Sequence, residues 1–156
     1  MQTFENADIM GKKVADQLVE TICSAGIRHI YAVTGDSLNE VNDAVRRAGT
    51  VRWIHMRHEE SGAFAATAEA ELNGLACCAG SSGPGHVHLI NGLYDAHRSN
   101  CSVLAIASTC PSDQFGTGYF QETSPIRLFD DCSGYNQMAG APVQFARMLP
   151  AALLHA

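Results

Sequence analysis

The stretch that decides the fold is Met56–Gly85, whose sequence is MRHEESGAFAATAEAELNGLACCAGSSGPG. It predicts a helix that begins at the acidic pair Glu59-Glu60 and is built mostly of small residues. A short strand over 75–79 follows, and then comes the glycine-rich loop Gly80–Gly85. Such a loop before a helix leaves backbone N–H groups free for a ligand. A helix face of small residues lets another backbone or a flat ligand approach closely.

Helices and strands alternate toward the N-terminus of this stretch. Strands are predicted over 29–33 and 51–56, where apolar runs lie between turn residues. Asp8 is expected to cap a first helix. The capping box Ser37-Leu38-Asn39-Glu40 is expected to open a second helix, which stops at Gly49.

The same alternation continues toward the C-terminus. A helix is predicted over 87–97, an apolar strand over 103–107, and a short helix from Ser124-Pro125 to Asp131. The loop between them, 110–123, has a length typical of functional or disordered segments. A last strand is expected over 135–139 and a last helix over 142–156. Pro150 should kink or split that helix, because proline lacks a backbone donor.

Strands alternating with helices at this spacing predict an α/β fold: an open, mostly parallel sheet with helices on both faces. Right-handed crossovers place the ends of the strands along one edge, and ligands of such sheets bind outside that edge. Gly35-Asp36, Glu59, the Gly80–Gly85 loop and the 119–122 segment all fall there. We therefore predict a site at this edge.

Composition bounds the class of protein. The chain has 156 residues, 46% of them hydrophobic and 17% charged, as expected for one globular domain with a large core. The net charge is −6 and no basic stripe is present, which argues against nucleic-acid binding. Neither a signal peptide nor an apolar run of about 20 residues is found, so we expect a cytoplasmic protein without a membrane span.

Cysteine and histidine patterns give no metal site. The six cysteines form no C-x-x-C pair, and Cys77-Cys78 lies in an apolar strand, so we interpret them as reduced structural thiols. The pairs His55/His58 and His86/His88 lack the further ligands that a zinc site needs. We therefore predict no metal ligands in this chain.

Five motifs carry a family resemblance: Thr34–Asn39, Arg57–Glu60, Gly80–Gly85, His88–Asp95 and Gly118–Glu122. In this order they resemble the N-terminal, pyrimidine-binding domain of thiamine-diphosphate-dependent enzymes. Within that superfamily the chain is most similar to the pyruvate oxidase and quinone-dependent pyruvate dehydrogenase group. The resemblance extends from about Met10 to the end of the chain and implies the Rossmann-like, three-layer fold of that domain.

The resemblance implies a catalytic role for Glu59. In this family the glutamate of Arg-His-Glu hydrogen-bonds a ring nitrogen of the cofactor's aminopyrimidine, and so promotes loss of the proton at C2 of the thiazolium ring. Glu60, by contrast, is interpreted as a carboxylate in the first helical turn, which the helix dipole favours. The dipole effect is also the alternative explanation for Glu59 itself.

Further site residues follow from the same resemblance. It implies that Gly35, Asp36 and Asn91 belong to the cofactor site and that Gly83-Pro84-Gly85 packs beside the pyrimidine. His88 is implied as an active-site histidine, with a histidine at a helix start as the alternative. The resemblance further implies that Phe120 and Gln121 face the substrate, with a solvated loop tip as the alternative.

The cofactors and partners are implied too. We expect thiamine diphosphate as cofactor and pyruvate or another small 2-keto acid as substrate, in a homo-oligomer. The Gly-Asp-Gly motif that holds the diphosphate and Mg²⁺ in this family does not occur here, and neither does the domain that carries FAD. We therefore expect a single pyrimidine-binding domain, truncated before its last strand and inactive alone. Alternatives are a separate pyrimidine-binding subunit of a split 2-keto acid decarboxylase, or a non-catalytic ligand-binding α/β module.

Overall fold

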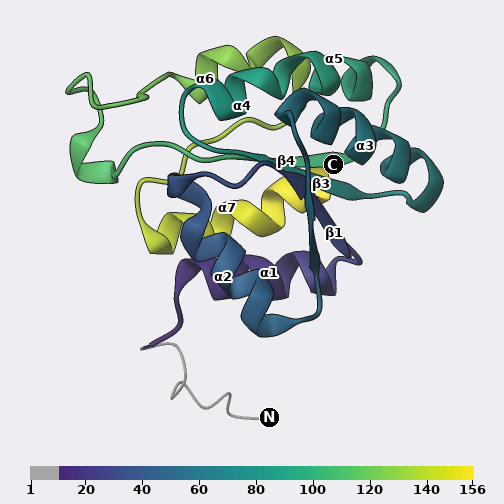
Figure 1. Ribbon diagram of the computed structural model, residues 1–156, viewed down its shortest axis with the longest axis horizontal. Coiled ribbons are helices and arrows are strands. Elements are labelled where there is room, and N and C mark those ends of the chain that lie inside the picture. Colours follow the sequence, from purple (N-terminus) through teal and green to yellow (C-terminus); the bar gives the residue numbers. More distant parts are fainter. Residues whose placement is uncertain (1–10) are drawn as a thin grey trace.

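A computed structural model describes residues 11–156 of the chain (Figure 1). Within this range one sheet is formed by four short strands: β1 (His29–Ala32), β2 (Arg52–His55), β3 (Ala76–Gly80) and β4 (Val103–Ala107). The strands lie in the order β2-β1-β3-β4, and all neighbours are parallel. The predicted α/β class and the parallel sheet are confirmed, and the four strand ends share one edge as expected.

Helices cover both faces of the sheet (Figure 1). One layer contains α1 (Val14–Ser24), α2 (Asn39–Ala48) and α7 (Pro142–His155). The other contains α3 (Glu59–Asn73), α4 (Pro84–His88), α5 (Ile90–Arg98) and α6 (Pro125–Leu128). Because side chains alternate along a strand, the fully buried β3 supplies both layers, with Cys77 in the first core and Cys78 in the second.

The small residues of α3 serve a close approach between helices. Gly62, Ala63, Ala66 and Ala70 are buried against β1, the sheet core and α5. A Cβ atom built on Gly92 of α5 would lie 2.5 Å from the Cβ of Ala63. The backbones of α3 and α5 therefore meet through this stripe. Either another backbone or a flat ligand was expected against this face, and the structure shows the backbone of α5 there.

Several boundaries differ from expectation. The first helix begins at Val14, with Lys13 at its N-cap, and the expected cap Asp8 lies outside the described residues. Ser37 does not cap α2: a 3-10 turn over Asp36–Leu38 precedes the helix, and the side chain of Ser37 is used elsewhere. The helix expected over 87–97 is divided into α4 and α5, and α4 starts earlier, at Pro84.

The expected strand over 135–139 is wrong, because this segment forms neither strand nor helix. Tyr135 instead stacks on His155 of α7, with ring centroids 5.2 Å apart, and its hydroxyl lies 3.5 Å from the carbonyl oxygen of Met148. Pro150 was expected to kink or split the last helix, and the structure shows that it does not split it, since α7 runs through Pro150. That helix forgoes the single hydrogen bond that the proline nitrogen cannot donate.

Strand β4 forms an edge of the sheet beside an apolar groove. The carbonyl of Ser102 accepts from Ala76 and the N–H of Ser108 donates to Gly80, so alternate residues between them face β3. The backbone groups of Val103, Ala105 and Ala107 therefore point away from β3. They face a groove of about 790 Å³ between β4, α7 and the 133–142 segment.

None of the helices within residues 11–156 combines the length and apolar character needed to cross a membrane.

Candidate functional site

The loops after β1 and β3 lie back to back at the carboxyl edge of the sheet. The hydroxyl oxygens of Ser37 and Ser81 are 2.8 Å apart, and the Ser37 oxygen accepts from the N–H of Ser82 at 2.9 Å. Gly35 approaches so closely that a Cβ there would lie 2.3 Å from the Ser81 hydroxyl oxygen. Two of the predicted site segments are thus joined in one wall.

Glu59 begins α3 beside this wall. The preceding residue, His58, caps the helix by accepting from the N–H of Glu60 at 3.3 Å. Glu59 is only 9% exposed, and one carboxylate oxygen, Oε2, lies 3.0 Å from Nδ1 of His88. Because a carboxylate oxygen accepts, this ring nitrogen is the donor. The structure therefore brings together Glu59 and His88, two residues that sequence reasoning assigned separately.

The other oxygen of Glu59 is reached past a glycine. A Cβ built on Gly85 would lie 3.4 Å from Oε1 of Glu59 and 3.1 Å from the Cβ of Ser81. Any side chain at position 85 would therefore contact the carboxylate of Glu59. Because residue 85 is glycine, it places no side-chain atom of its own against Oε1 of Glu59.

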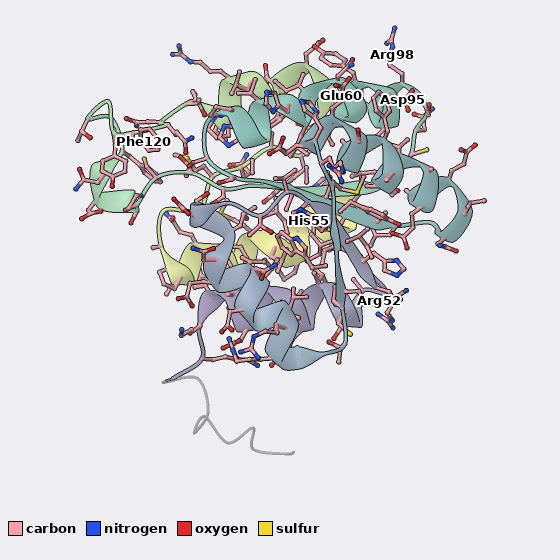
Figure 2. The ribbon with its side chains drawn as sticks, viewed as in Figure 1. Arg52, His55, Glu60, Asp95, Arg98 and Phe120 are labelled. Atoms are coloured by element: carbon pink, nitrogen blue, oxygen red, sulfur yellow. The ribbon has the colours of Figure 1, made fainter. Side chains whose placement is uncertain are left out.

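Glu60 has different surroundings. It is about one third exposed at the side chain and accepts a hydrogen bond from the amide of Asn91. In Figure 2, Glu60 lies in the helical layer that also carries Asp95 and Arg98. Asn91 is itself exposed, so the structure places this predicted cofactor residue on Glu60 rather than on Glu59. The two acids therefore differ in their surroundings, since Glu59 is nearly buried and Glu60 is partly exposed.

Three groups at this site could approach one cation. His58, Glu59 and His88 each offer a ligand atom, and these atoms lie within 4.8 Å of one another. However, Nδ1 of His58 already accepts from a backbone N–H, and Nδ1 of His88 already bonds Glu59. The two imidazole rings are stacked, with centroids 4.5 Å apart. The contacts that these three residues make are therefore those of a hydrogen-bonded, stacked cluster.

The 110–123 loop reaches the site through one of the two residues predicted on it. Oε1 of Gln121 accepts from the hydroxyl of Ser82 at 3.1 Å, and a Cβ on Gly83 would lie 2.8 Å from the Cβ of Gln121. Phe120 is 76% exposed and stands out on the loop, well apart from Glu60 in Figure 2. Within this chain, Gln121 therefore joins the glycine-rich loop, whereas Phe120 faces solvent.

The tip of this loop is ordered by its own glutamate. The carboxylate of Glu122 accepts from the N–H groups of Gly116, Gly118 and Tyr119. These hydrogen bonds, that from Gly116 first, lower the pKa of Glu122. The loop that presents Phe120 and Gln121 is thus exposed, and three hydrogen bonds to the Glu122 carboxylate fix the backbone at its tip.

Asp36 and Pro84 occupy the rims of the site. Asp36 is exposed at the start of the 3-10 turn after β1, and Pro84 is exposed at the first turn of α4. Pro84 suits that place because its missing N–H would have no partner inside the helix. Gly83 before it has a φ of 63°, a conformation that glycine adopts without strain.

Sequence reasoning missed the polar residues that tie these loops together, which are Ser37, Ser81, Ser82, His86 and Ser108. Ser37 was assigned to a helix cap, and His86 was considered only as half of a metal pair. Their partners lie 22 to 71 residues away in the chain. Only the repeated serines around Gly80–Gly85 could have suggested such a network.

Open parallel α/β domains bind their ligands outside the carboxyl ends of the strands, and Glu59 and the glycine-rich loop lie at that edge. Residues 12–128 match the family described as thiamine pyrophosphate enzyme, N-terminal TPP binding domain, and the chain belongs to this family. The resemblance noted in the sequence is confirmed at this level, and thiamine diphosphate is the cofactor of the family.

Several curated relatives are similar to most of this chain. The chain is 56% identical over 142 residues to a 42.6 kDa protein of Pseudomonas amyloderamosa encoded in the isoamylase 3′ region. It is 36% identical over 124 residues to pyruvate oxidase of Lactiplantibacillus plantarum, and 34% identical over 128 residues to acetolactate synthase 3 of Brassica napus. These matches cover 90%, 78% and 81% of this chain, but only 36%, 21% and 20% of the respective relatives.

Proposed function

We propose that this chain is the pyrimidine-binding part of a thiamine-diphosphate-dependent enzyme that oxidises pyruvate or a related 2-keto acid, with Glu59 as the acid that activates the cofactor. The supporting observation is the state of Glu59. Its carboxylate is almost buried, one oxygen is held by His88, and the other lies beside Gly85, which carries no side chain.

The surroundings of Glu59 suit the transfer of a proton. The hydrogen bond from His88 fixes the carboxylate, so that Oε1 is left to share a proton with a ring nitrogen. The low exposure of Glu59 keeps water from competing for that oxygen. Bound thiamine diphosphate supplies the electron sink for loss of carbon dioxide from a 2-keto acid. This chain's residues hold the pyrimidine and the proton.

Other parts of the proposal extend beyond this chain. We assign the diphosphate group, its Mg²⁺ and FAD to parts of the complete enzyme that are not in this sequence. The relatives named pyruvate oxidase and acetolactate synthase match at nearly equal identity, and both names concern chemistry of small keto acids. Pyruvate oxidation is preferred because the segment Gly118–Glu122 resembles that group.

A titration with the cofactor's pyrimidine tests the role of Glu59. The ligand is 4-amino-5-hydroxymethyl-2-methylpyrimidine, added to the ¹⁵N-labelled chain and followed by amide chemical shifts. We expect shifts at Glu59, Gly83 and Gly85, and at least tenfold weaker binding in Glu59→Gln, which corresponds to about 1.4 kcal/mol. The matched control Glu60→Gln should bind within about twofold of the original chain, because that acid faces Asn91.

Activation of the cofactor is tested in a larger protein that carries this chain as its N-terminal domain. The N-terminal part of Lactiplantibacillus plantarum pyruvate oxidase is replaced by this chain, and deuterium exchange at C2 of bound thiamine diphosphate is measured. Glu59→Gln should abolish rapid exchange, and Glu60→Gln should leave most of it. Equal exchange rates in both variants, or pyrimidine shifts confined to another surface, would remove Glu59 from the mechanism.

A further inference from the structure

His86 joins the two ends of the loop that carries Gln121. Its side chain lies at the end of the Gly80–Gly85 segment and is completely buried. Nδ1 lies 2.8 Å from the carbonyl oxygen of Ser108, where the loop begins, and Nε2 bonds the hydroxyl of Thr123, where it ends. Because a carbonyl can only accept, Nδ1 carries the proton and Nε2 accepts the Thr123 hydroxyl proton.

A second link joins the same two segments a few residues away. The hydroxyl of Ser82 donates to Gln121, and Gly83 packs directly on the Gln121 backbone. Gln121 has a φ of 59°, an uncommon conformation for a residue other than glycine. Gln121 itself contacts Ser82 and Gly83, and two residues further along the chain Thr123 is bonded to His86. These contacts lie around the uncommon backbone conformation of Gln121.

The type of side chain matches this task. A neutral imidazole offers one donor and one acceptor on opposite edges of a rigid ring, so it can span an acceptor and a donor that belong to different segments. Burial lowers the pKa of His86, which keeps the ring neutral near pH 7. The edge of Phe129 packs toward the same ring, with centroids 6.0 Å apart, and fixes its plane.

We propose that His86 is a positioning residue: its bridge between Ser108 and Thr123 closes the loop and holds Gln121 on Gly83, at the border of the Glu59 site. The role of Gln121 toward substrate rests on the proposed function, but the bridge itself does not. Closing a loop of this length is opposed by chain entropy, and two partly buried hydrogen bonds to one rigid ring counter that cost. Without the bridge, the Gln121 backbone should relax and the loop should open.

Limited proteolysis of the 156-residue chain measures this opening. Chymotrypsin cleaves after aromatic residues, and Tyr119 and Phe120 lie at the exposed tip of the loop. Thr123→Val removes the hydroxyl while keeping the shape of the side chain, and Thr123→Ser is the matched control that keeps the hydroxyl. We expect about tenfold faster cleavage at Tyr119–Phe120 in Thr123→Val, equivalent to about 1.4 kcal/mol. Thr123→Ser should stay within about twofold of the original chain.

His86→Asn gives an independent reading, because the shorter side chain can still donate toward Ser108 but does not reach Thr123. Cleavage should accelerate as in Thr123→Val, and the double variant should add little to either single change. Amide exchange of Gly83 and Gln121 should accelerate in parallel, while the urea midpoint reported by Trp53 fluorescence stays too high for global unfolding to explain the cleavage.

Three results would overturn the inference. They are cleavage of Thr123→Val at the original rate, equal acceleration in Thr123→Ser, or fully additive effects in the double variant. These readings are separate from the test of the proposed function. If the loop opens as expected but the pyrimidine does not bind, the bridge stands and the cofactor assignment fails. If the pyrimidine binds but loop cleavage is unchanged in the variants, the cofactor assignment stands and the bridge fails.

Discussion

Replacing Gly92 by alanine tests whether the contact between α3 and α5 organises the site layer. The added Cβ would lie 2.5 Å from the Cβ of Ala63 and 2.9 Å from the backbone nitrogen of Phe64. Carbon atoms in contact normally lie about 3.5–4.0 Å apart, so the helices must separate by about 1 Å. Ala63 is fully buried and two of the three nearest atoms belong to the backbone, so the strain cannot be relieved by rotating a side chain.

The magnitude follows from two opposing effects. Alanine is better than glycine in a helix interior by about 1 kcal/mol, whereas overpacking costs about 1–3 kcal/mol. With backbone atoms as neighbours we take the upper end and expect a net loss of about 2 kcal/mol. For a chain of this length, that lowers the Tm by about 4–8 °C.

Urea unfolding followed by Trp53 fluorescence, together with thermal melts, measures this loss. The matched control is Gly134→Ala, where a Cβ would meet nothing within 4 Å and the effect should stay within about 0.5 kcal/mol. Stability of Gly92→Ala equal to or above that of the original chain would refute the packing argument. It would mean that the two helices can separate freely.

Three other predictions concern protonation, activity and the sheet edge. Burial lowers the pKa of His86 in the folded chain, so on acidification the unfolded chain binds a proton at this residue before the folded chain does. The free energy of unfolding should therefore fall as the pH drops below about 6.5. Urea midpoints should fall less over this range in His86→Gln. Parallel pH profiles would contradict this. The isolated chain, given thiamine diphosphate and Mg²⁺, should release no ¹⁴CO₂ from labelled pyruvate above a blank, because the proposed diphosphate and metal ligands lie elsewhere; release by the purified chain would contradict it. Extending Ala156 with a short turn and a valine- and threonine-rich strand should raise the Tm above that of an equally long Gly/Ser extension. The reason is that backbone groups of Val103, Ala105 and Ala107 point away from β3 into the groove. Equal melting would show that the edge needs no partner.

The order of helices and strands was predictable because it depends on local pattern. Apolar runs between turn residues located all four strands to within about one residue at each end, and Gly49 and Gly74 closed the helices before them. The parallel arrangement followed from the intervening helices, since parallel strands need such crossovers. Glu59 was singled out as a candidate by the Arg-His-Glu motif of the family resemblance, and it lies where a strand passes into a helix.

The errors arose where distant partners outweigh local pattern. Ser37 satisfies a capping box in sequence, yet its hydroxyl bonds Ser81 and the N–H of Ser82 across the site. The pairing of Glu59 with His88 spans 29 residues, so no local pattern could reveal it. The 135–139 segment has strand-like composition, but a strand exists only where another strand pairs with it, and Tyr135 packs on α7 instead.

Stability and site geometry meet in the same two helices, which gives the small residues of α3 a functional meaning. Glu59 is the first residue of α3, and His88 lies just before α5, so the distance between these helices sets the 3.0 Å contact between the two side chains. Gly92 sets how closely the helices approach. A change that separates them by about 1 Å therefore lengthens a hydrogen bond beyond its working range as well as costing stability. A helix made of larger apolar residues would bury more surface, but it would hold Glu59 and His88 too far apart to share a hydrogen bond.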